Sequence, residues 1–95
     1  MGIQFIGVSE VENYLNKENV EFIDLRDTKE YRKKHIRGAI SMPYDSFMKE
    51  FATLSKKKIY ILYCDRGATS ILAVSAMQKS GYRCMSLAGG IKAFE

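Results

Sequence analysis

Cys64 marks the point where one sequence pattern ends and another begins. The five residues before it, Ile59–Tyr63, are apolar, β-branched or aromatic, which is typical of a strand buried on both faces. From Ser70 onward, apolar residues recur at the spacing of a helix. The intervening residues 64–69 contain Gly67 and predict a sharp turn. Cys64 is therefore expected at the carboxyl end of a strand, just before the N-terminus of a helix.

A cysteine in that position can act as a nucleophile. The first N–H groups of a helix have no helical partner, and the helix dipole adds partial positive charge. Both effects favour a thiolate over a thiol, and the same N–H groups can hold an anion against the sulfur. The alternative is that Cys64 is a small buried apolar residue, as free cysteines often are. The glycine-containing turn favours the nucleophile, because such a turn is expected to expose its first residue.

Composition limits the other kinds of function. The chain has 95 residues, enough for one domain with a single modest core, and we expect residues 1–95 to form that domain. An apolar fraction of 46% argues against disorder. Two widely spaced cysteines and one histidine form no metal-binding pattern, so we expect no metal and no cofactor.

Charge and hydropathy limit the partners. The net charge of +4 suits a small anionic substrate. The basic residues are scattered and surround no nucleic-acid motif, so no nucleic-acid partner is expected. No apolar run reaches membrane-spanning length, and residues 3–6 are too short for the core of a signal peptide. We therefore expect a cytoplasmic protein with reduced thiols and no membrane partner.

Four further short apolar runs predict strands, at residues 3–6, 20–25, 38–42 and 83–87. Helical patterns follow four of the five strands, beginning near residues 9, 28, 45 and 70. Strands that alternate with helices predict an α/β fold, with a mostly parallel five-stranded sheet and helices on both faces. Ligands bind at the carboxyl edge of such sheets, where Cys64 and residues 24–27 are both expected.

Capping residues predict where the helices begin and end. Ser9, with Glu12 three residues later, has the form of a capping box. Thr28 is expected to cap the second helix, and Ser70 is a candidate cap for the helix after the cysteine turn. Gly81 stands where that helix should end.

Five segments together are specific for one family. They are Phe22-Ile-Asp-Leu-Arg26 with Glu30 and Tyr31; His35-Ile-Arg-Gly-Ala39 with Pro43; Tyr63-Cys64 with Gly67 and Ser70; Gly81-Tyr82; and Leu87-Ala-Gly-Gly90. Each segment alone is a weak signal, whereas five in this order are a strong one. In this order they resemble a single-domain rhodanese, a sulfurtransferase, over essentially the whole chain.

The resemblance implies a rhodanese-like fold and an activity of the thiosulfate sulfurtransferase type. Cys64 would take the outer sulfur of a small anionic donor such as thiosulfate and hold it as a persulfide. The acceptor would be a thiol, cyanide or a protein thiol. The rest of the loop would bind the substrate, mainly through backbone N–H groups; these residues are Asp65, Arg66, Gly67, Ala68, Thr69 and Ser70. The Arg66 side chain either attracts the anionic part of the donor or is a solvated loop cation.

Two alternatives to a small-molecule enzyme stay open. One is a non-catalytic rhodanese-like binding module, although such modules often lack the cysteine. The other is a persulfide carrier that delivers sulfur to a protein partner. A cysteine phosphatase is not favoured, because it needs an arginine six residues after the cysteine, where this chain has Ser70.

Three residues depart from the family pattern. Lys34 stands where the family usually has Gly before the His, and Phe94 stands where Trp is common. Asp65 places a carboxylate beside the nucleophile, where well-known thiosulfate-using loops carry a basic residue. We expect Asp65 to oppose the binding of an anion at close range.

Other polar residues are expected to be structural. Asp24, Arg26 and Glu30 follow a strand end in a spacing that suits loops pinned together by an ion pair. The single histidine, His35, is expected to be hydrogen-bonded and away from the nucleophile. Cys84 is expected near the start of its strand, on the order of 15 Å from the nucleophile at 3.3 Å per residue. That separation exceeds the reach of a disulfide, so Cys84 is interpreted as a core residue.

Overall fold

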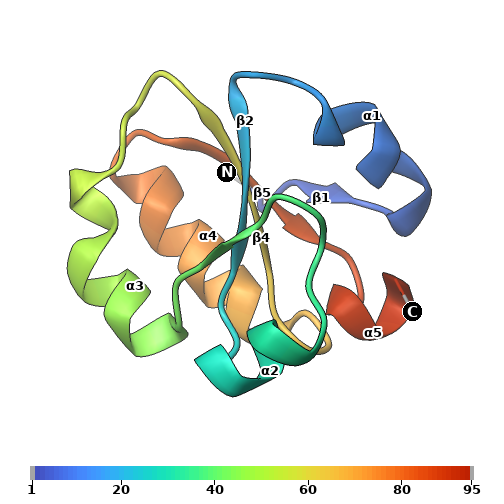
Figure 1. Ribbon diagram of the computed structural model, residues 1–95. Coiled ribbons are helices and arrows are strands. Elements are labelled where there is room, and N and C mark those ends of the chain that lie inside the picture. Colours follow the sequence, from blue (N-terminus) through green and yellow to red (C-terminus); the bar gives the residue numbers. More distant parts are fainter. Residues whose placement is uncertain (1, 95) are drawn as a thin grey trace.

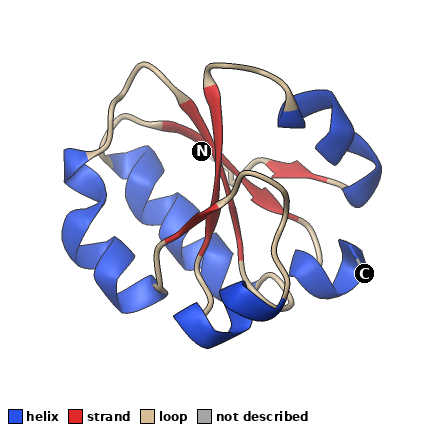
Figure 2. Ribbon diagram, in the orientation of Figure 1, coloured by secondary structure: helices blue, strands red, loops and turns tan. Residues whose placement is uncertain are grey.

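Five parallel strands form a single sheet, in the order β1-β5-β4-β2-β3, in the computed structural model, which describes residues 2–94 (Figures 1 and 2). The strands are β1 (Phe5–Ile6), β2 (Val20–Asp24), β3 (Ile40–Ser41), β4 (Ile59–Tyr63) and β5 (Arg83–Leu87). The helices are α1 (Val11–Leu15), α2 (Thr28–Lys33), α3 (Tyr44–Glu50), α4 (Ala68–Lys79) and α5 (Gly90–Phe94), with short 3-10 helices η1 (Val8–Glu10) and η2 (Phe51–Thr53). The predicted parallel five-stranded α/β fold is confirmed.

Helices cover both faces of this sheet. Helices α3 and α4 lie on one face, α1 and α5 lie on the other, and α2 stands at one end of the sheet (Figure 1). Each face has its own hydrophobic core: Phe47, Val74 and Met77 belong to the first, and Val11 and Ile91 belong to the second. Among residues 2–94, no helix has the length and apolar character needed to cross a bilayer.

Strand β4 lies at the centre of the sheet and belongs to both cores. Tyr60 and Leu62 pack in the core under α3 and α4, whereas Ile61 and Tyr63 pack in the core under α1 and α5. This alternation is the period of two that strand geometry imposes. It directs the side chain of the next residue, Cys64, into the core on the α3 and α4 face.

Strands β2 and β4 end at the same level. Asp24 is paired with Tyr63, and the N–H of Leu25 donates a hydrogen bond of 2.9 Å to the Tyr63 carbonyl oxygen. The chain therefore leaves both strands at one edge of the sheet, side by side. The predicted proximity of residues 24–27 and Cys64 is confirmed.

Several element boundaries differ from the prediction. The edge strands β1 and β3 have two residues each, because each pairs with a single neighbour over a short stretch. Helix α3 begins at Tyr44, directly after Pro43, and gives way to the tighter helix η2 at Phe51. Helix α4 begins at Ala68 rather than at Ser70. The turn after β4 is therefore shorter than predicted.

The predicted caps at Ser9 and Thr28 are wrong. At the first position the chain begins as a 3-10 helix, and the Glu10 carboxylate accepts a hydrogen bond of 2.8 Å from the Gly7 N–H. At the second, the Asp27 carboxylate lies one residue earlier and accepts a hydrogen bond from the third helical N–H. In both places the capping hydrogen bond is made by an acidic side chain and not by the predicted hydroxyl.

Gly81 ends α4 as predicted. Its φ of 90° lies in the left-handed region, and its N–H donates to the Gln78 carbonyl oxygen. The Tyr82 N–H reaches back to the Met77 carbonyl oxygen at 3.2 Å. Together these two bonds form a Schellman motif, which satisfies the last carbonyl groups of the helix.

Candidate active site

A turn of four residues, 64–67, connects β4 to α4. Gly67 ends it as the residue before the helix, with a φ of 104°. A side chain on Gly67 would also contact the backbone of Gly89, since a Cβ atom there would lie 3.4 Å from the Gly89 nitrogen. Glycine is therefore the residue that this turn accommodates without strain.

The sulfur of Cys64 lies inside the turn and is surrounded by hydrogen-bond donors. The N–H groups of Gly67 and Ser70 donate to Sγ at 3.2 Å and 3.4 Å. Both N–H groups belong to the first turn of α4, as predicted from the unpaired donors of a helix N-terminus. These donors stabilise negative charge on the sulfur, because each is aimed directly at it.

The predicted exposure of Cys64 is wrong, because the residue is only 6% exposed. Strand alternation turns its side chain toward α4, and the first turn of that helix closes over the sulfur. The sulfur is thus reached from a pocket rather than from the open surface. Its surroundings combine the apolar core under α3 and α4 with two N–H donors.

Ser70 lies within the helix and does not cap it. Its side chain is fully buried. The Ser70 hydroxyl oxygen accepts a hydrogen bond from the Cys64 thiol at 3.7 Å, and the hydroxyl donates one to the Gly67 carbonyl oxygen at 3.2 Å. A second hydroxyl, that of Ser86 in β5, lies 2.7 Å from the Ser70 hydroxyl. Sequence reasoning missed Ser86. A polar residue on the core-facing side of an otherwise buried strand was the available signal.

A pocket of about 420 Å³ opens beside the sulfur. The residues that line it come from the segment after β2, from α2, from the start of α3 and from the cysteine loop: Leu25, Arg26, Asp27, Glu30, Tyr44, Cys64, Asp65, Arg66, Ala68 and Thr69. The predicted loop residues therefore divide into two groups. Four of them line the pocket with Cys64, whereas Gly67 and Ser70 lie behind the sulfur and offer their N–H groups to it.

Arg26 is the buried cation of this pocket. Its side chain is 7% exposed and binds the fully buried Asp24 carboxylate through Nε at 3.1 Å and Nη2 at 2.8 Å. Nη2 also donates to the carbonyl oxygen of Lys34, which ties the segment after α2 to the end of β2. The hydrogen bond to Asp24 raises the pKa of Arg26 above its ordinary value. The geometry agrees with the structural role expected for this pair.

Arg26 also faces the cysteine loop. Its Nη1 lies 4.0 Å from a carboxylate oxygen of Asp65, whose side chain is 56% exposed. The carboxylate predicted to oppose an anion is therefore directed toward the one buried guanidinium of the pocket. Sequence reasoning did not anticipate this contact, because residues 26 and 65 are far apart in the chain.

His35 takes no part in the pocket. Its ring stacks on Tyr31 with centroids 3.8 Å apart, and its Nδ1 lies 2.7 Å from the Tyr31 carbonyl oxygen. These contacts order the segment that follows α2. The arrangement agrees with the structural role expected for the single histidine.

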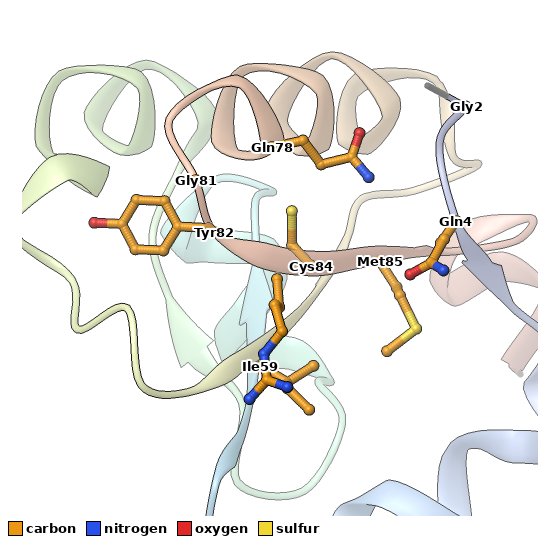
Figure 3. Close-up of a pocket in the computed structure, with 9 residues that line it drawn as sticks. Gly2, Gln4, Ile59, Gln78, Gly81, Tyr82, Cys84 and Met85 are labelled. Atoms are coloured by element: carbon orange, nitrogen blue, oxygen red, sulfur yellow. The ribbon is translucent and has the colours of Figure 1, made fainter.

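Cys84 belongs to the opposite edge of the sheet. It is paired with Tyr60, four residues before Cys64, which places the two cysteines about 13 Å apart along the strands at 3.3 Å per residue. Figure 3 shows its side chain pointing toward α4, beside a second pocket of about 490 Å³, and its sulfur lies 3.6 Å from the Val74 carbonyl oxygen. Burial raises the pKa of the Cys84 thiol to about 11, so this thiol stays protonated at neutral pH.

Helix α5 holds the cysteine loop from behind. The N–H of Ile91 donates to the Cys64 carbonyl oxygen at 2.9 Å, and the N–H of Lys92 donates to the Asp65 carbonyl oxygen at 3.0 Å. Gly90 lies so close to these carbonyl groups that a Cβ atom on it would be 2.6 Å from the Cys64 oxygen. The close approach of these two backbone segments thus requires glycine at position 90.

Comparison with known proteins assigns this arrangement to a family. The Rhodanese-like domain family matches residues 7–95. The thiosulfate sulfurtransferase PspE of Escherichia coli (strain K12) is 32% identical over 73 residues, which cover 75% of this chain and 70% of PspE. A tRNA sulfurtransferase of Pyrobaculum aerophilum is 31% identical over 70 residues, covering 74% of this chain and 14% of that protein. Three of the curated relatives, two tRNA sulfurtransferases and a probable molybdopterin-synthase adenylyltransferase, are matched over only 14% to 25% of their length.

Solved structures agree on the fold. A rhodanese-related protein from Thermoplasma volcanium superposes with a TM-score of 0.87 at 21% identity, covering 96% of this chain and 89% of that one. A rhodanese-like domain protein from Staphylococcus aureus gives a TM-score of 0.88 at 24% identity, covering 98% and 92%. With its parallel sheet, its cysteine loop and the match over residues 7–95, this chain belongs to the rhodanese-like domain family.

Proposed function

We propose that this protein is a sulfurtransferase that moves a sulfane sulfur from a donor such as thiosulfate to a thiol or cyanide acceptor through a persulfide on Cys64. The family and its sulfurtransferase relatives support the reaction class. The observation that carries the proposal is the position of the Cys64 sulfur. It receives two backbone N–H hydrogen bonds and borders a pocket large enough for a small donor.

In the first half-reaction, the Cys64 thiolate attacks the outer sulfur of the donor. With thiosulfate, the bond between the two sulfur atoms of the donor breaks as the new S–S bond forms. Sulfite leaves with the electron pair, and the products are sulfite and the Cys64 persulfide anion. Charge is conserved, because one thiolate and one dianion give one persulfide anion and one dianion.

The loop then stabilises the persulfide. Its outer sulfur is anionic at neutral pH and extends from Sγ into the pocket, to which the loop contributes Asp65, Arg66, Ala68 and Thr69. Donors fixed by the first turn of α4 need no reorganisation when the charge moves outward from Sγ. In the second half-reaction, an acceptor thiolate or cyanide attacks the outer sulfur, and the Cys64 thiolate is the leaving group.

A persulfide carrier that serves a protein partner is the second candidate. The putative sulfur carrier protein YrkF of Bacillus subtilis is 29% identical over 66 residues, covering 70% of this chain and 36% of that protein. Ile71 and Leu72, in the α4 helix that follows the Cys64 loop, are 37% and 60% exposed. Exposed apolar side chains on this helix suit the docking of a protein acceptor. A cytoplasmic location, where both free thiols stay reduced, fits either candidate.

Intact mass spectrometry tests the proposal. After incubation with thiosulfate and removal of the excess, the wild type should gain the mass of one sulfur atom. Cys64→Ala should gain none, and Cys84→Ala, the matched control, should gain one. Sulfur that remains on Cys64→Ala would contradict the assignment. Catalytic formation of thiocyanate from cyanide favours the enzyme, whereas a single loading event without turnover favours the carrier.

A further inference from the structure

The charges that line the Cys64 pocket are mixed. Two guanidinium groups, those of Arg26 and Arg66, face three carboxylates, those of Asp27, Glu30 and Asp65. A site built for a dianion such as thiosulfate would be expected to carry an excess of cations. This pocket has an excess of carboxylates instead.

Arg26, the buried cation of the pocket, already has partners for its guanidinium nitrogens. Arg26 uses Nε and Nη2 on Asp24 and on the Lys34 carbonyl oxygen, and Nη1 faces the Asp65 carboxylate at 4.0 Å. An anionic group entering the pocket would have to displace Asp65 from Arg26 or lie beside both. The Asp65 carboxylate thus competes with any incoming anion for Arg26, the buried cation of the pocket.

Helix α2 brings two further carboxylates to the pocket. Asp27 and Glu30 stand at the start of α2, at the same end of the sheet as the cysteine loop (Figure 1). The Asp27 carboxylate accepts one backbone hydrogen bond, from the N–H of Glu30. The Glu30 carboxylate contacts Lys33 at 3.5 Å in an exposed pair, which leaves it screened by solvent and free to move. Both are acceptors for a cation that enters the pocket mouth.

We propose that the sulfur donor is a persulfide whose carrier thiol bears a positively charged group close to its sulfur, and that Asp65 is the residue that selects it against thiosulfate. The inference rests on the proposed sulfur transfer through Cys64. The cationic group would lie between Asp65 and the carboxylates of α2, while the sulfane sulfur approaches Sγ. The donor could be a small aminothiol persulfide or a cysteine persulfide flanked by basic residues in a protein.

The transfer step is balanced without an added oxidant or reductant. The Cys64 thiolate attacks the outer sulfur of the donor RS–SH, and the S–S bond of the donor breaks. The carrier leaves as the thiolate RS⁻, and the proton stays on the new Cys64 persulfide or passes to water. One sulfur atom and no net electrons are transferred, so the chemistry differs from the thiosulfate reaction only in the leaving group.

Two persulfides of similar size and opposite charge provide the test. Cysteamine persulfide carries an ammonium two carbons from its sulfur, and 3-mercaptopropionate persulfide carries a carboxylate there. The rate of sulfur addition to Cys64 is measured by quenched intact mass, for these two donors and for thiosulfate. The wild type should load from cysteamine persulfide at least about ten times faster than from 3-mercaptopropionate persulfide, with a smaller ratio at high salt.

The variant Asp65→Asn keeps the side-chain size and removes the charge. It should raise the rates for thiosulfate and 3-mercaptopropionate persulfide about ten-fold and leave the cysteamine persulfide rate unchanged or lower. Glu18→Gln is the matched control, because Glu18 is exposed in the turn before β2, at the other end of the sheet. This control makes the same change in net charge and should leave the donor ratio as it is in the wild type.

Equal wild-type rates for the two persulfides would overturn the proposal. So would an equal rise for all three donors in Asp65→Asn, since the residue would then act through loop geometry. Failure of every donor to load Cys64 is a different result, because it would overturn sulfur transfer itself. A lysine-flanked peptide persulfide that loads faster than cysteamine persulfide indicates a protein-borne donor, and slower loading indicates a small aminothiol; both outcomes support the selection by charge.

Discussion

Gly90 packs directly on the backbone of Asp65, the residue after Cys64. A Cβ atom on Gly90 would overlap the Asp65 carbonyl group and would lie 2.6 Å from the Cys64 carbonyl oxygen. The φ of Gly90 is 66°, in the left-handed region. The contact leaves no room for a side chain, and it fixes the distance between α5 and the cysteine loop.

Gly90→Ala should therefore lower both stability and sulfur loading. We expect a loss of more than about 2 kcal/mol in the free energy of unfolding, since the strain of a positive φ adds to the overlap with Asp65. Gly38→Ala is the control, because Gly38 has a φ of 83° and nothing within 4 Å of the added Cβ. It should cost only about 1–2 kcal/mol, the strain alone. Urea unfolding measures the stability of both variants. Equal losses would show that α5 moves away from the added methyl group without a loss of stability.

The hydroxyl pair of Ser70 and Ser86 should behave as a unit. Each single change to Ala leaves the other buried hydroxyl without this partner, at a cost of about 1–3 kcal/mol. The double variant Ser70→Ala/Ser86→Ala leaves no such orphan, so its cost should fall below the sum of the two single costs by about 1 kcal/mol. A double-mutant cycle in urea measures this coupling. Strictly additive losses would mean that the 2.7 Å contact contributes nothing of its own.

Removal of the Arg26 side chain should be strongly destabilising. Arg26→Ala leaves the fully buried Asp24 carboxylate without its charged partner, at a cost of about 3–5 kcal/mol. Replacing that carboxylate as well, in Arg26→Ala/Asp24→Asn, should recover part of the loss. The pair of Lys58 and Glu21, 3.1 Å apart and much less buried, offers the comparison. Lys58→Ala should cost less than about 1 kcal/mol, and a similar cost at both pairs would contradict the role of burial.

Stability should fall as the pH rises from about 9 to about 11. Burial raises the pKa of Cys84 from an ordinary 9.0 to about 11. Below pH 9 the Cys84 thiol is protonated in both the folded and the unfolded chain, so its full contribution to the free energy of unfolding is present. Above pH 9 only the unfolded chain loses the proton, which favours unfolding by at most about 3 kcal/mol once the pH passes 11.

Urea unfolding at a series of pH values checks this dependence. Cys84→Ala should be less stable than the wild type at pH 7, because a small cavity replaces the sulfur, yet it should lose less stability between pH 9 and pH 11. Part of the fall in stability with pH should remain in Cys84→Ala, since burial also raises the pKa of Tyr60 and Tyr63. An unchanged slope in Cys84→Ala would show that the tyrosines alone cause it.

The central elements were predictable from sequence because strong local signals bound them. β4 and β5 have the bounds that their apolar runs indicate, and Gly81 ends α4 where a left-handed residue is needed. The edge strands were predicted too long, because hydrophobicity does not reveal where a neighbouring strand stops pairing. The parallel order followed from alternation of strands with helices, which leaves few other topologies.

The site was predictable in its position and not in its detail. The strand-to-helix pattern located Cys64 and its N–H donors, since both depend on residues close in sequence. The burial of Cys64 depends on which face of β4 it continues, and the turn was two residues shorter than predicted. Contacts such as Arg26 with Asp65 and Ser70 with Ser86 join distant segments. No local pattern encodes such contacts, because they arise only when the strands are placed in order.

The bonds from α5 to the cysteine loop have a consequence for the order of assembly. A ribosome makes the chain from its N-terminus, so residues 64–67 are synthesised before the Gly90–Phe94 helix whose N–H groups hold them. Until that last helix docks, two carbonyl groups of the loop lack their partners, and the turn has no fixed support behind the sulfur. We therefore expect the backbone behind the thiol to reach its final position only when α5 docks. On this expectation, sulfur loading of Cys64 reports on a completed domain, and a nascent chain that still lacks residues 90–94 loads less readily.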